Sequence, residues 1–283
     1  MTRMSPRVLV LGGSGLLGGH LLERLPSSFP TAAVPGRTGR VTTGDRIEWL
    51  AHPIDVDAAA TIDAALDRAR ADVIVNAIGA EPRAASADLA RVNARFPRAL
   101  ATLAARRGAR VVQISSDAVF SGARGAYRED DRPDPVDAYG RSKLEGELNA
   151  PHLTLRTSVY GRSARGTGLI EWLIAQQGRC VDGFADYRFS GMAAPLLADF
   201  VAAAIDAGLE GVYHIGGDPV TKYELLSAAA ARLRLGMTVR PAARGAVDRT
   251  LDSTRFFAAA GRRRPTLAES MEALTSCDVP SRA

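Results

Sequence analysis

The 283-residue sequence predicts an α/β fold: a Rossmann-like, doubly wound parallel sheet with a small C-terminal region. Three observations lead to this prediction. Short apolar runs alternate with stretches of helical periodicity as far as about residue 157. The first apolar run, at 7–11, leads directly into a glycine-containing turn at 12–19. Beyond residue 157 the pattern becomes irregular, so we expect one domain at 1–160 and a further region at 161–283.

The individual elements follow from the period of the apolar residues. Strands are expected where aliphatic and β-branched residues form short runs between turn residues. In chain order these runs are 7–11, 31–36, 47–52, 73–77, 110–115 and 153–157. Helices are expected where apolar residues recur every three or four positions. These stretches are a helix ending near 25, then 57–70, 87–107, one containing 139–143, 169–177, 195–207 and 222–233.

The turn after the first strand has the spacing Gly-x-x-Gly-x-x-Gly, formed by Gly12, Gly15 and Gly18 with Leu16 and Leu17 between them. Such glycines allow a tight turn, close approach of backbone N–H groups to a pyrophosphate, and close packing of the following helix. The turn lacks the Gly-Lys-Ser/Thr ending of a nucleotide-hydrolysing P-loop. We therefore predict dinucleotide binding at these five residues; the alternative is a glycine turn without a ligand.

A tyrosine and a lysine stand four residues apart, at Tyr139 and Lys143. On a helix this spacing places both side chains on one face. An ammonium beside the phenol favours the phenolate, so we expect Lys143 to lower the pKa of Tyr139 toward neutral pH. A tyrosine of that kind transfers protons to or from an oxygen. The alternative is a packed ring beside a solvated charge.

Composition excludes several other classes of protein. The chain has a net charge of +5 and a pI near 9.6, but its arginines are scattered and no recognition motif accompanies them, so nucleic-acid binding is not expected. The two cysteines lie far apart and the four histidines form no ligand pair, so no metal site is expected. The N-terminal apolar run is too short for a membrane span or secretory signal, and we expect a cytoplasmic protein.

Several motifs, in their order and spacing, resemble the extended short-chain dehydrogenase/reductases, and within them the dTDP-4-dehydrorhamnose reductases. The segments that carry this resemblance are the glycine turn, Val-Ile-Val-Asn-Ala-Ile-Gly at 73–79, Val-Asn-Ala at 92–94, Ile-Ser-Ser-Asp-Ala-Val-Phe-Ser-Gly at 114–122, Ala-Tyr-Gly-Arg-Ser-Lys-Leu-Glu-Gly-Glu at 138–147 and Leu-Arg-Thr-Ser-Val-Tyr-Gly at 155–161. The family uses a nicotinamide cofactor to reduce the 4-keto group of a nucleotide-linked sugar. The resemblance therefore implies a small-molecule nucleotide-sugar substrate. It also implies that the small C-terminal region at 161–283 is mainly a substrate-binding region, with a last strand at 212–215, in a segment near 211–216, that returns to the sheet.

The resemblance also implies the catalytic roles. Ser116 would donate a hydrogen bond to the substrate carbonyl, with Ser115 as the alternative. Tyr139 would protonate the alkoxide, and Lys143 would hold the cofactor ribose as well as lowering the pKa of the tyrosine. Asp117 would either orient the substrate or accept hydrogen bonds from backbone N–H groups of the turn.

Cofactor choice depends on the end of the second strand. A carboxylate there selects NAD by binding the ribose hydroxyls, whereas Arg accommodates the 2′-phosphate of NADP. Arg37 and Arg40 follow this strand, and no carboxylate occurs before Asp45. We predict NADPH as the cofactor, with Arg37 as the first phosphate ligand; NADH is the alternative.

Two further turns resemble cofactor contacts of the family. Asp55 and Val56, after the third strand, correspond to its adenine contact. After the fourth strand, a turn of small residues would let the backbone reach the ribose; it consists of Ala77, Ile78 and Gly79.

Position 118 distinguishes among related activities. Dehydratases of the superfamily tend to have Glu after the Asp of the serine motif, and this chain has Ala118, so dehydration is disfavoured. The dehydrorhamnose reductases usually have Tyr there, so the sugar remains open. The leading hypothesis is an NADPH-dependent ketoreductase. The alternatives are a nucleotide-sugar epimerase of the same fold and a cofactor-binding regulatory subunit. The oligomeric state is open, with a homodimer as one candidate.

Overall fold

The computed structural model describes residues 5–34, 46–163 and 165–275. Among these residues, no helix is both long and apolar enough to cross a membrane. Within the same ranges, no group of three or more His, Cys, Asp or Glu side chains is placed to hold a metal ion.

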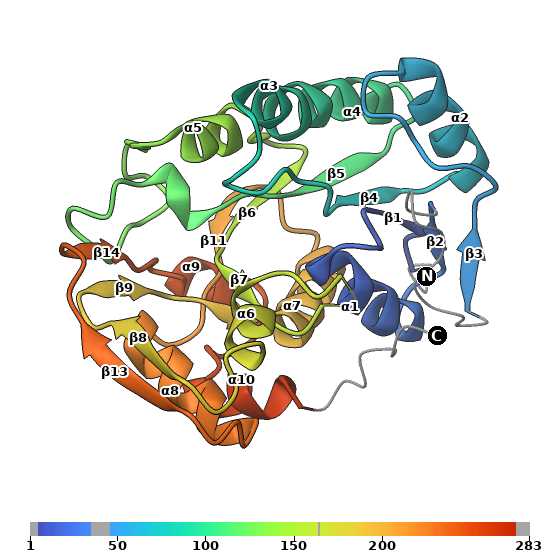
Figure 1. The fold of residues 1–283 in the computed structure, drawn as a ribbon. Coiled ribbons are helices and arrows are strands. Elements are labelled where there is room, and N and C mark those ends of the chain that lie inside the picture. The colour runs from blue at the N-terminus through green and yellow to red at the C-terminus, as the bar shows by residue number, and fades with distance from the viewer. Residues whose placement is uncertain (1–4, 35–45, 164, 276–283) are drawn as a thin grey trace.

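A parallel sheet forms the centre of the molecule (Figure 1). Its seven described strands lie in the order β11-β6-β5-β4-β1-β2-β3. Their bounds are β1 (Val8–Leu11), β2 (Thr31–Ala33), β3 (Ile47–Trp49), β4 (Val73–Asn76), β5 (Arg110–Ile114), β6 (Leu153–Arg156) and β11 (Gly211–His214). The chain winds outward from β1 to β3, then returns to β4 beside β1 and winds the other way. This topology confirms the predicted fold class, and its switch point lies between β1 and β4.

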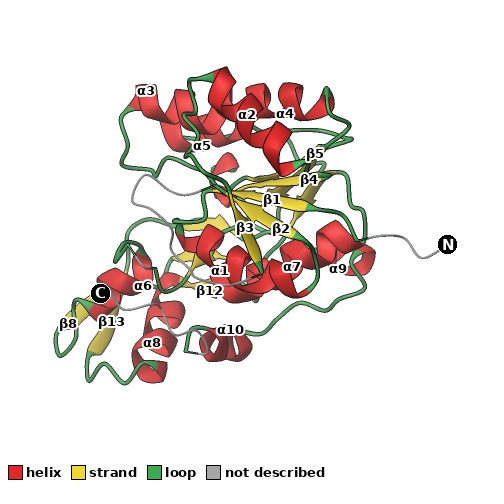
Figure 2. Cartoon of the chain, turned by 90° about the vertical axis from the view of Figure 1, so that its right-hand side faces the viewer, coloured by secondary structure: helices red, strands yellow, loops and turns green. Residues whose placement is uncertain are grey.

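Helices cover both faces of the sheet, as Figures 1 and 2 show. Val8 and Val10 face one side of β1 and pack in a core with α1, α7 and α9, whereas Leu9 and Leu11 face the other side and pack with α2 and α4. The first layer consists of α1 (Leu16–Arg24), α7 (Ala194–Asp206) and α9 (Thr254–Ala259). The second consists of α2 (Ala59–Ala69), α3 (Ser86–Asp88), the π-helical segment η2 (Leu89–Arg95), α4 (Phe96–Ala105) and α5 (Ala138–Glu145).

The expected helix at 87–107 is therefore three consecutive helical segments, with η2 in the middle. Helix α5 packs tightly against η2: a Cβ added at Gly146, just after α5, would overlap the carbonyl oxygen of Asn93. π-Helical turns often occur at functional sites, and this one positions Asn93 between α5 and the turn that follows β4.

Much of the chain beyond residue 157 forms a smaller lobe with its own apolar core (Figure 1). Its strands pair as β7–β10, β8–β13 and β12-β9-β14. The bounds are β7 (Val159–Tyr160), β8 (Cys180–Phe184), β9 (Tyr187–Phe189), β10 (Met192–Ala193), β12 (Val220–Thr221), β13 (Thr238–Ala242), β14 (Val247–Arg249), α6 (Leu169–Ile174), α8 (Lys222–Arg232) and α10 (Leu267–Ala273). The sequence predicted α6 and α8 but not these strands, because each has only two to five residues and pairs with a distant segment.

Candidate active site

The glycine turn is packed against the turn that follows β4. Gly12 has a φ of +86°, and an added Cβ would lie 2.8 Å from the carbonyl carbon of Ala77 and from the nitrogen of Ile78. At Gly18 a Cβ would overlap the carbonyl oxygen of Gly12. Gly15 precedes α1 and leaves its first turn without a side-chain cap. Only glycine fits Gly12 and Gly18, and the resulting cradle of backbone N–H groups fits a dinucleotide pyrophosphate.

The turn after β4 also approaches the helix that carries Lys143. A Cβ added at Gly79 would lie 3.8 Å from the Lys143 Nζ and 3.5 Å from the Asn93 Oδ1. Asn93 accepts a 2.8 Å hydrogen bond from the Ala80 N–H and donates to the Ala80 carbonyl and to the Ser142 hydroxyl. Asn93 thus fixes the backbone beside the lysine.

Lys143 is buried, and its Nζ donates a 2.7 Å hydrogen bond to the carbonyl oxygen of Ile114, the last residue of β5. Burial lowers the pKa of Lys143 to about 8, although the nearby Glu147 opposes this shift. The ammonium has three donors, and this bond uses one of them. The remaining donors lie beside Gly79, where a cofactor ribose would be bound.

Ser116 and Tyr139 are joined by a hydrogen bond between their side chains. Ser116 also caps the short helix η3 (Asp117–Val119), because its hydroxyl accepts from the Ala118 N–H at 3.1 Å. Ser115, the alternative, instead donates a 2.7 Å hydrogen bond to Glu147. The structure therefore brings Ser116, and not Ser115, to the tyrosine.

The expected lowering of the tyrosine pKa is wrong for this structure. Burial raises the pKa of Tyr139 to about 12, and the hydrogen bond with Ser116 offsets only part of the effect. Lys143 is not among the groups that shift this pKa, and its ammonium donates to the Ile114 carbonyl. Tyr139 is consequently a neutral phenol that retains its proton at neutral pH.

A cluster of three charged residues, Asp117, Lys222 and Arg249, adjoins Ser116 and Tyr139. The sequence analysis identified only Asp117 among them. Asp117 is buried, which raises the pKa of its carboxyl group, while Lys222 and Arg249 act in the opposite direction. Burial lowers the pKa of Lys222 to about 8. No short motif links these three residues, because Lys222 begins α8 and Arg249 ends β14, far along the chain from Asp117.

Of the residues predicted to contact the adenine and the 2′-phosphate, the structure describes only Asp55 and Val56. The Asp55 carboxylate is exposed and accepts a hydrogen bond from the Asp57 N–H, while Val56 packs against the apolar core. The Asp55 contact is ordinary turn chemistry that leaves its second oxygen for another donor. Arg37 and Arg40, the predicted phosphate ligands, lie outside the described residues.

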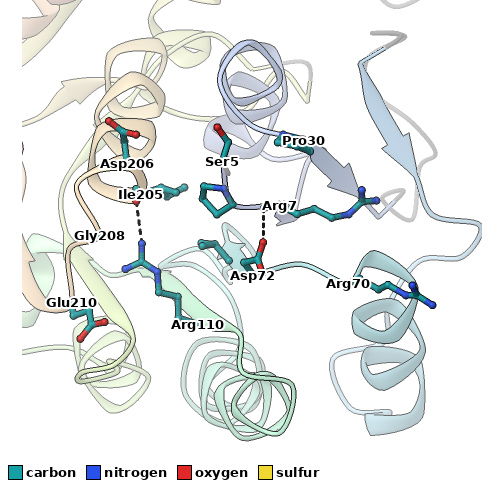
Figure 3. Close-up of a pocket in the computed structure, with 12 residues that line it drawn as sticks. Ser5, Arg7, Pro30, Arg70, Asp72, Arg110, Ile205, Asp206, Gly208 and Glu210 are labelled. Atoms are coloured by element: carbon teal, nitrogen blue, oxygen red, sulfur yellow. Dashed lines mark hydrogen bonds between the residues drawn. The ribbon is translucent and has the colours of Figure 1, made fainter. Parts of the chain in front are cut away.

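A separate surface depression lies at the opposite, amino ends of the strands (Figure 3). There the Arg7 N–H donates to Asp72, and Arg110 donates to the carbonyl oxygens of Ile205 and Leu209. Doubly wound sheets bind ligands at the carboxyl ends of their strands. Ser116, Tyr139 and Lys143 adjoin those carboxyl ends, so we place the candidate active site there and not in the depression.

The sequence matches the family model described as the RmlD substrate binding domain over residues 6–255. One relative, a probable dTDP-4,6-dihydroxy-2-methyloxan-3-one 4-ketoreductase of Streptomyces antibioticus, is 33% identical over 74% of this chain and 70% of its own. Another, the methionine adenosyltransferase 2 subunit beta of Bos taurus, is 30% identical over 81% of this chain and 72% of its own.

Among solved structures, the dTDP-4-dehydrorhamnose reductase of Bacillus anthracis in complex with NADP has the same fold. The TM-score is 0.79, with 22% identity over 96% of this chain and 99% of that one.

Proposed function

Since the chain belongs to the RmlD substrate binding domain family, as its motifs predicted, we propose that it is an NADPH-dependent reductase of a keto group on a nucleotide-linked sugar. The observation that carries this proposal is the hydrogen bond between Ser116 and Tyr139, with Lys143 next to the turn that adjoins the glycine loop. The 4-ketoreductase named among the relatives supports the same reaction class.

The backbone around Gly12, Gly15 and Gly18 would hold the cofactor pyrophosphate, and Lys143 with the turn of Ala77, Ile78 and Gly79 would hold the nicotinamide ribose. A reduced nicotinamide, when bound, supplies hydride to a carbonyl carbon. Asp55 and Val56 would contact the adenine, and Arg37 would bind the 2′-phosphate. A neighbour of the same fold was solved with NADP, which supports NADPH as the cofactor.

The protein's own residues would handle the proton and the oxygen. Ser116 would hold the substrate carbonyl by a hydrogen bond, and Tyr139 would donate its proton to the oxygen as negative charge develops there. Tyr139, whose pKa burial raises to about 12, carries that proton at neutral pH. A neutral acid at this position suits reduction, since the reverse reaction needs a base.

The region beyond residue 160 would bind the sugar nucleotide, while residues 1–160 would bind the cofactor. This division is supported by the position of Lys222 and Arg249, which the smaller lobe brings near Asp117 in the first domain. A second candidate function is a regulatory subunit, favoured by the relation to the methionine adenosyltransferase 2 subunit beta. The complete Ser116, Tyr139 and Lys143 set supports the reductase instead.

The test is to incubate the purified protein with NADPH and a panel of 4-keto nucleotide-sugars and to follow the absorbance of the reduced nicotinamide. Consumption of NADPH with formation of the hydroxy sugar is expected. Conversion of the sugar without net loss of NADPH would indicate the epimerase. Cofactor binding without turnover on any member of the panel would favour the regulatory subunit.

A further inference from the structure

We propose that Lys222 and Arg249 form a binding site for an anionic group on the sugar of the substrate, a carboxylate close to the reacting keto carbon. This inference rests on the proposed function, and it names the class of sugar that the same site takes. It depends on the placement of two cations, on the lack of ion-pair partners for them among the described residues, and on their position beside Asp117.

The two cations are positioned by the three-stranded sheet β12-β9-β14. Phe189 at the end of β9 pairs with Val220 on one side and with Arg249 on the other, and Lys222 follows two residues after Val220. The Lys222 Nζ lies 3.5 Å from the centroid of the Phe189 ring and 5.3 Å from that of Tyr187. Arg249 donates a long hydrogen bond, 3.5 Å, to the Tyr187 hydroxyl. The three-stranded sheet therefore places both cations next to the aromatic side chains of Tyr187 and Phe189.

Among the described residues, neither of these partly buried cations has an ion-pair partner. Within the described parts of the chain, the Lys222 ammonium forms no hydrogen bond and no ion pair, and its contacts are with aromatic rings. The Arg249 Nε is buried without a hydrogen-bond partner. Asp117 is the carboxylate whose charge reaches both, but its hydrogen bonds are with Ser116 and Ser158. Lys222 faces the charges of Asp117 and Arg249, and Asp137 acts on the neighbouring Tyr187 ring. Neither carboxylate is paired directly with the Lys222 ammonium, and a ligand anion would supply that partner.

Lysine is rare in this protein, and its placement is informative. Of the 36 Lys and Arg residues, only Lys143 and Lys222 are lysines. Both lie in the candidate active site, Lys143 buried and Lys222 partly buried, and the pKa of each is lowered to about 8. A compact ammonium on a flexible stem differs from the wide, planar guanidinium used elsewhere on the chain. The position of Lys222, like that of Lys143, therefore suits a contact with a ligand and not a solvated surface.

The connectivity identifies the part of the substrate that would carry the anion. Asp117 directly follows Ser116, which is hydrogen-bonded to Tyr139, and these two residues would contact the keto oxygen. A group bound between Asp117 and the two cations would therefore be attached to the sugar ring. The competing anion is the diphosphate that links sugar to nucleoside, and the experiment separates the two sources.

The experiment compares matched ligands on the NADP-loaded protein by calorimetry: dTDP-glucose, dTDP-glucuronate and dTDP alone. The first two differ only in a hydroxymethyl group replaced by a carboxylate. We expect dTDP-glucuronate to bind roughly tenfold more tightly than dTDP-glucose, the usual effect of one charge-assisted contact. Lys222→Gln should abolish this preference, Arg249→Gln should reduce it, and Lys222→Arg should restore part of it. Arg188→Gln, an exposed position of the same sheet, serves as the control and should leave the preference unchanged.

Three results would overturn the inference. Equal affinity for the two sugars, unaffected by Lys222→Gln, would leave the cations without a ligand role. Equal weakening of all three ligands in Lys222→Gln would assign the cations to the diphosphate. Failure of the wild-type protein to bind any of the three would contradict the proposed function itself, and the inference with it. NADP affinity of each variant shows that the fold is retained.

Discussion

The ammonium of Lys143 donates a 2.7 Å hydrogen bond to the carbonyl oxygen of Ile114, across from α5 to the end of β5. In this position the lysine links α5, the helix that carries Tyr139, to the sheet. Its remaining donors lie beside Gly79, at the turn that would line the cofactor ribose. The residue would thus connect cofactor binding with the position of the helix that carries the tyrosine.

Lys143→Met should therefore weaken NADPH binding as well as turnover. Methionine fills a similar volume without the charge, so the loss of ribose contacts is the main effect, and a charge-assisted hydrogen bond contributes about 1.5–3 kcal/mol. We expect NADPH affinity to fall by roughly tenfold or more, measured by fluorescence titration. Unchanged NADPH affinity would remove the ribose role. A thermal unfolding curve close to that of the wild type would show that the loss is local.

Tyr139→Phe should separate binding from chemistry. The ring and its packing remain, but the proton donor is gone, so NADPH affinity should stay within about twofold while turnover on an active keto-sugar falls by about 10²–10⁴-fold. The two measurements are a cofactor titration and the rate of NADPH oxidation. Near-native turnover would make Tyr139 a packed aromatic residue and would favour the regulatory-subunit alternative.

Arg37→Ala should narrow the preference for NADPH over NADH. The second strand is followed by arginines and by no carboxylate before Asp45, so a contact to the 2′-phosphate is expected to give NADPH roughly a tenfold advantage. Parallel titrations with NADPH and NADH measure the ratio, and only NADPH affinity should change in the variant. A wild-type protein that binds the two cofactors equally, or prefers NADH, would end this assignment.

A buried ion pair below the site gives a prediction about stability. Arg156 binds both oxygens of Glu147 at 2.8 and 2.9 Å, and Ser115 donates to the same carboxylate. Glu147→Gln would leave the Arg156 charge buried without its partner, so the free energy of unfolding should fall by about 3–5 kcal/mol. Denaturant unfolding with Asp182→Asn as the control, which breaks the exposed pair with Arg240, should show a loss of at most about 1 kcal/mol for the control. Similar losses for the two variants would contradict the prediction.

Features of the fold and the site could be predicted from the sequence where they depend on residues close together in the chain, and could not where they depend on contacts between distant segments. The glycine turn and the helix with Tyr139 and Lys143 are local patterns, so their elements could be predicted from spacing alone. The pKa of Tyr139 could not, because it depends on burial and on the direction that the Lys143 ammonium takes toward β5.

The cluster of Asp117, Lys222 and Arg249 could not be predicted from the sequence for the same reason. Lys222 and Arg249 come to Asp117 only through pairing of β9 with β12 and β14, strands of two or three residues each. Such short strands carry little periodicity, and their existence depends on partners distant in the sequence. The lysine itself was visible as the start of a predicted helix, but nothing in the order of residues shows what lies across from it.

The proposed anion site should depend on pH in a way that identifies Lys222. Burial lowers the pKa of Lys222 from 10.5 to about 8, against the opposing effect of Asp117 and together with that of Arg249. The ammonium is charged below this pKa and neutral above it, so the ratio of dTDP-glucuronate to dTDP-glucose affinity should fall as pH rises from about 7 to about 9. The ratio cancels the titration of Lys143, since both ligands are measured on the same NADP-loaded protein. Lys222→Arg should give a ratio that does not change over this range, because a guanidinium stays charged. A wild-type ratio as constant as that of the arginine variant would show that the charge of Lys222 is not what selects the carboxylate.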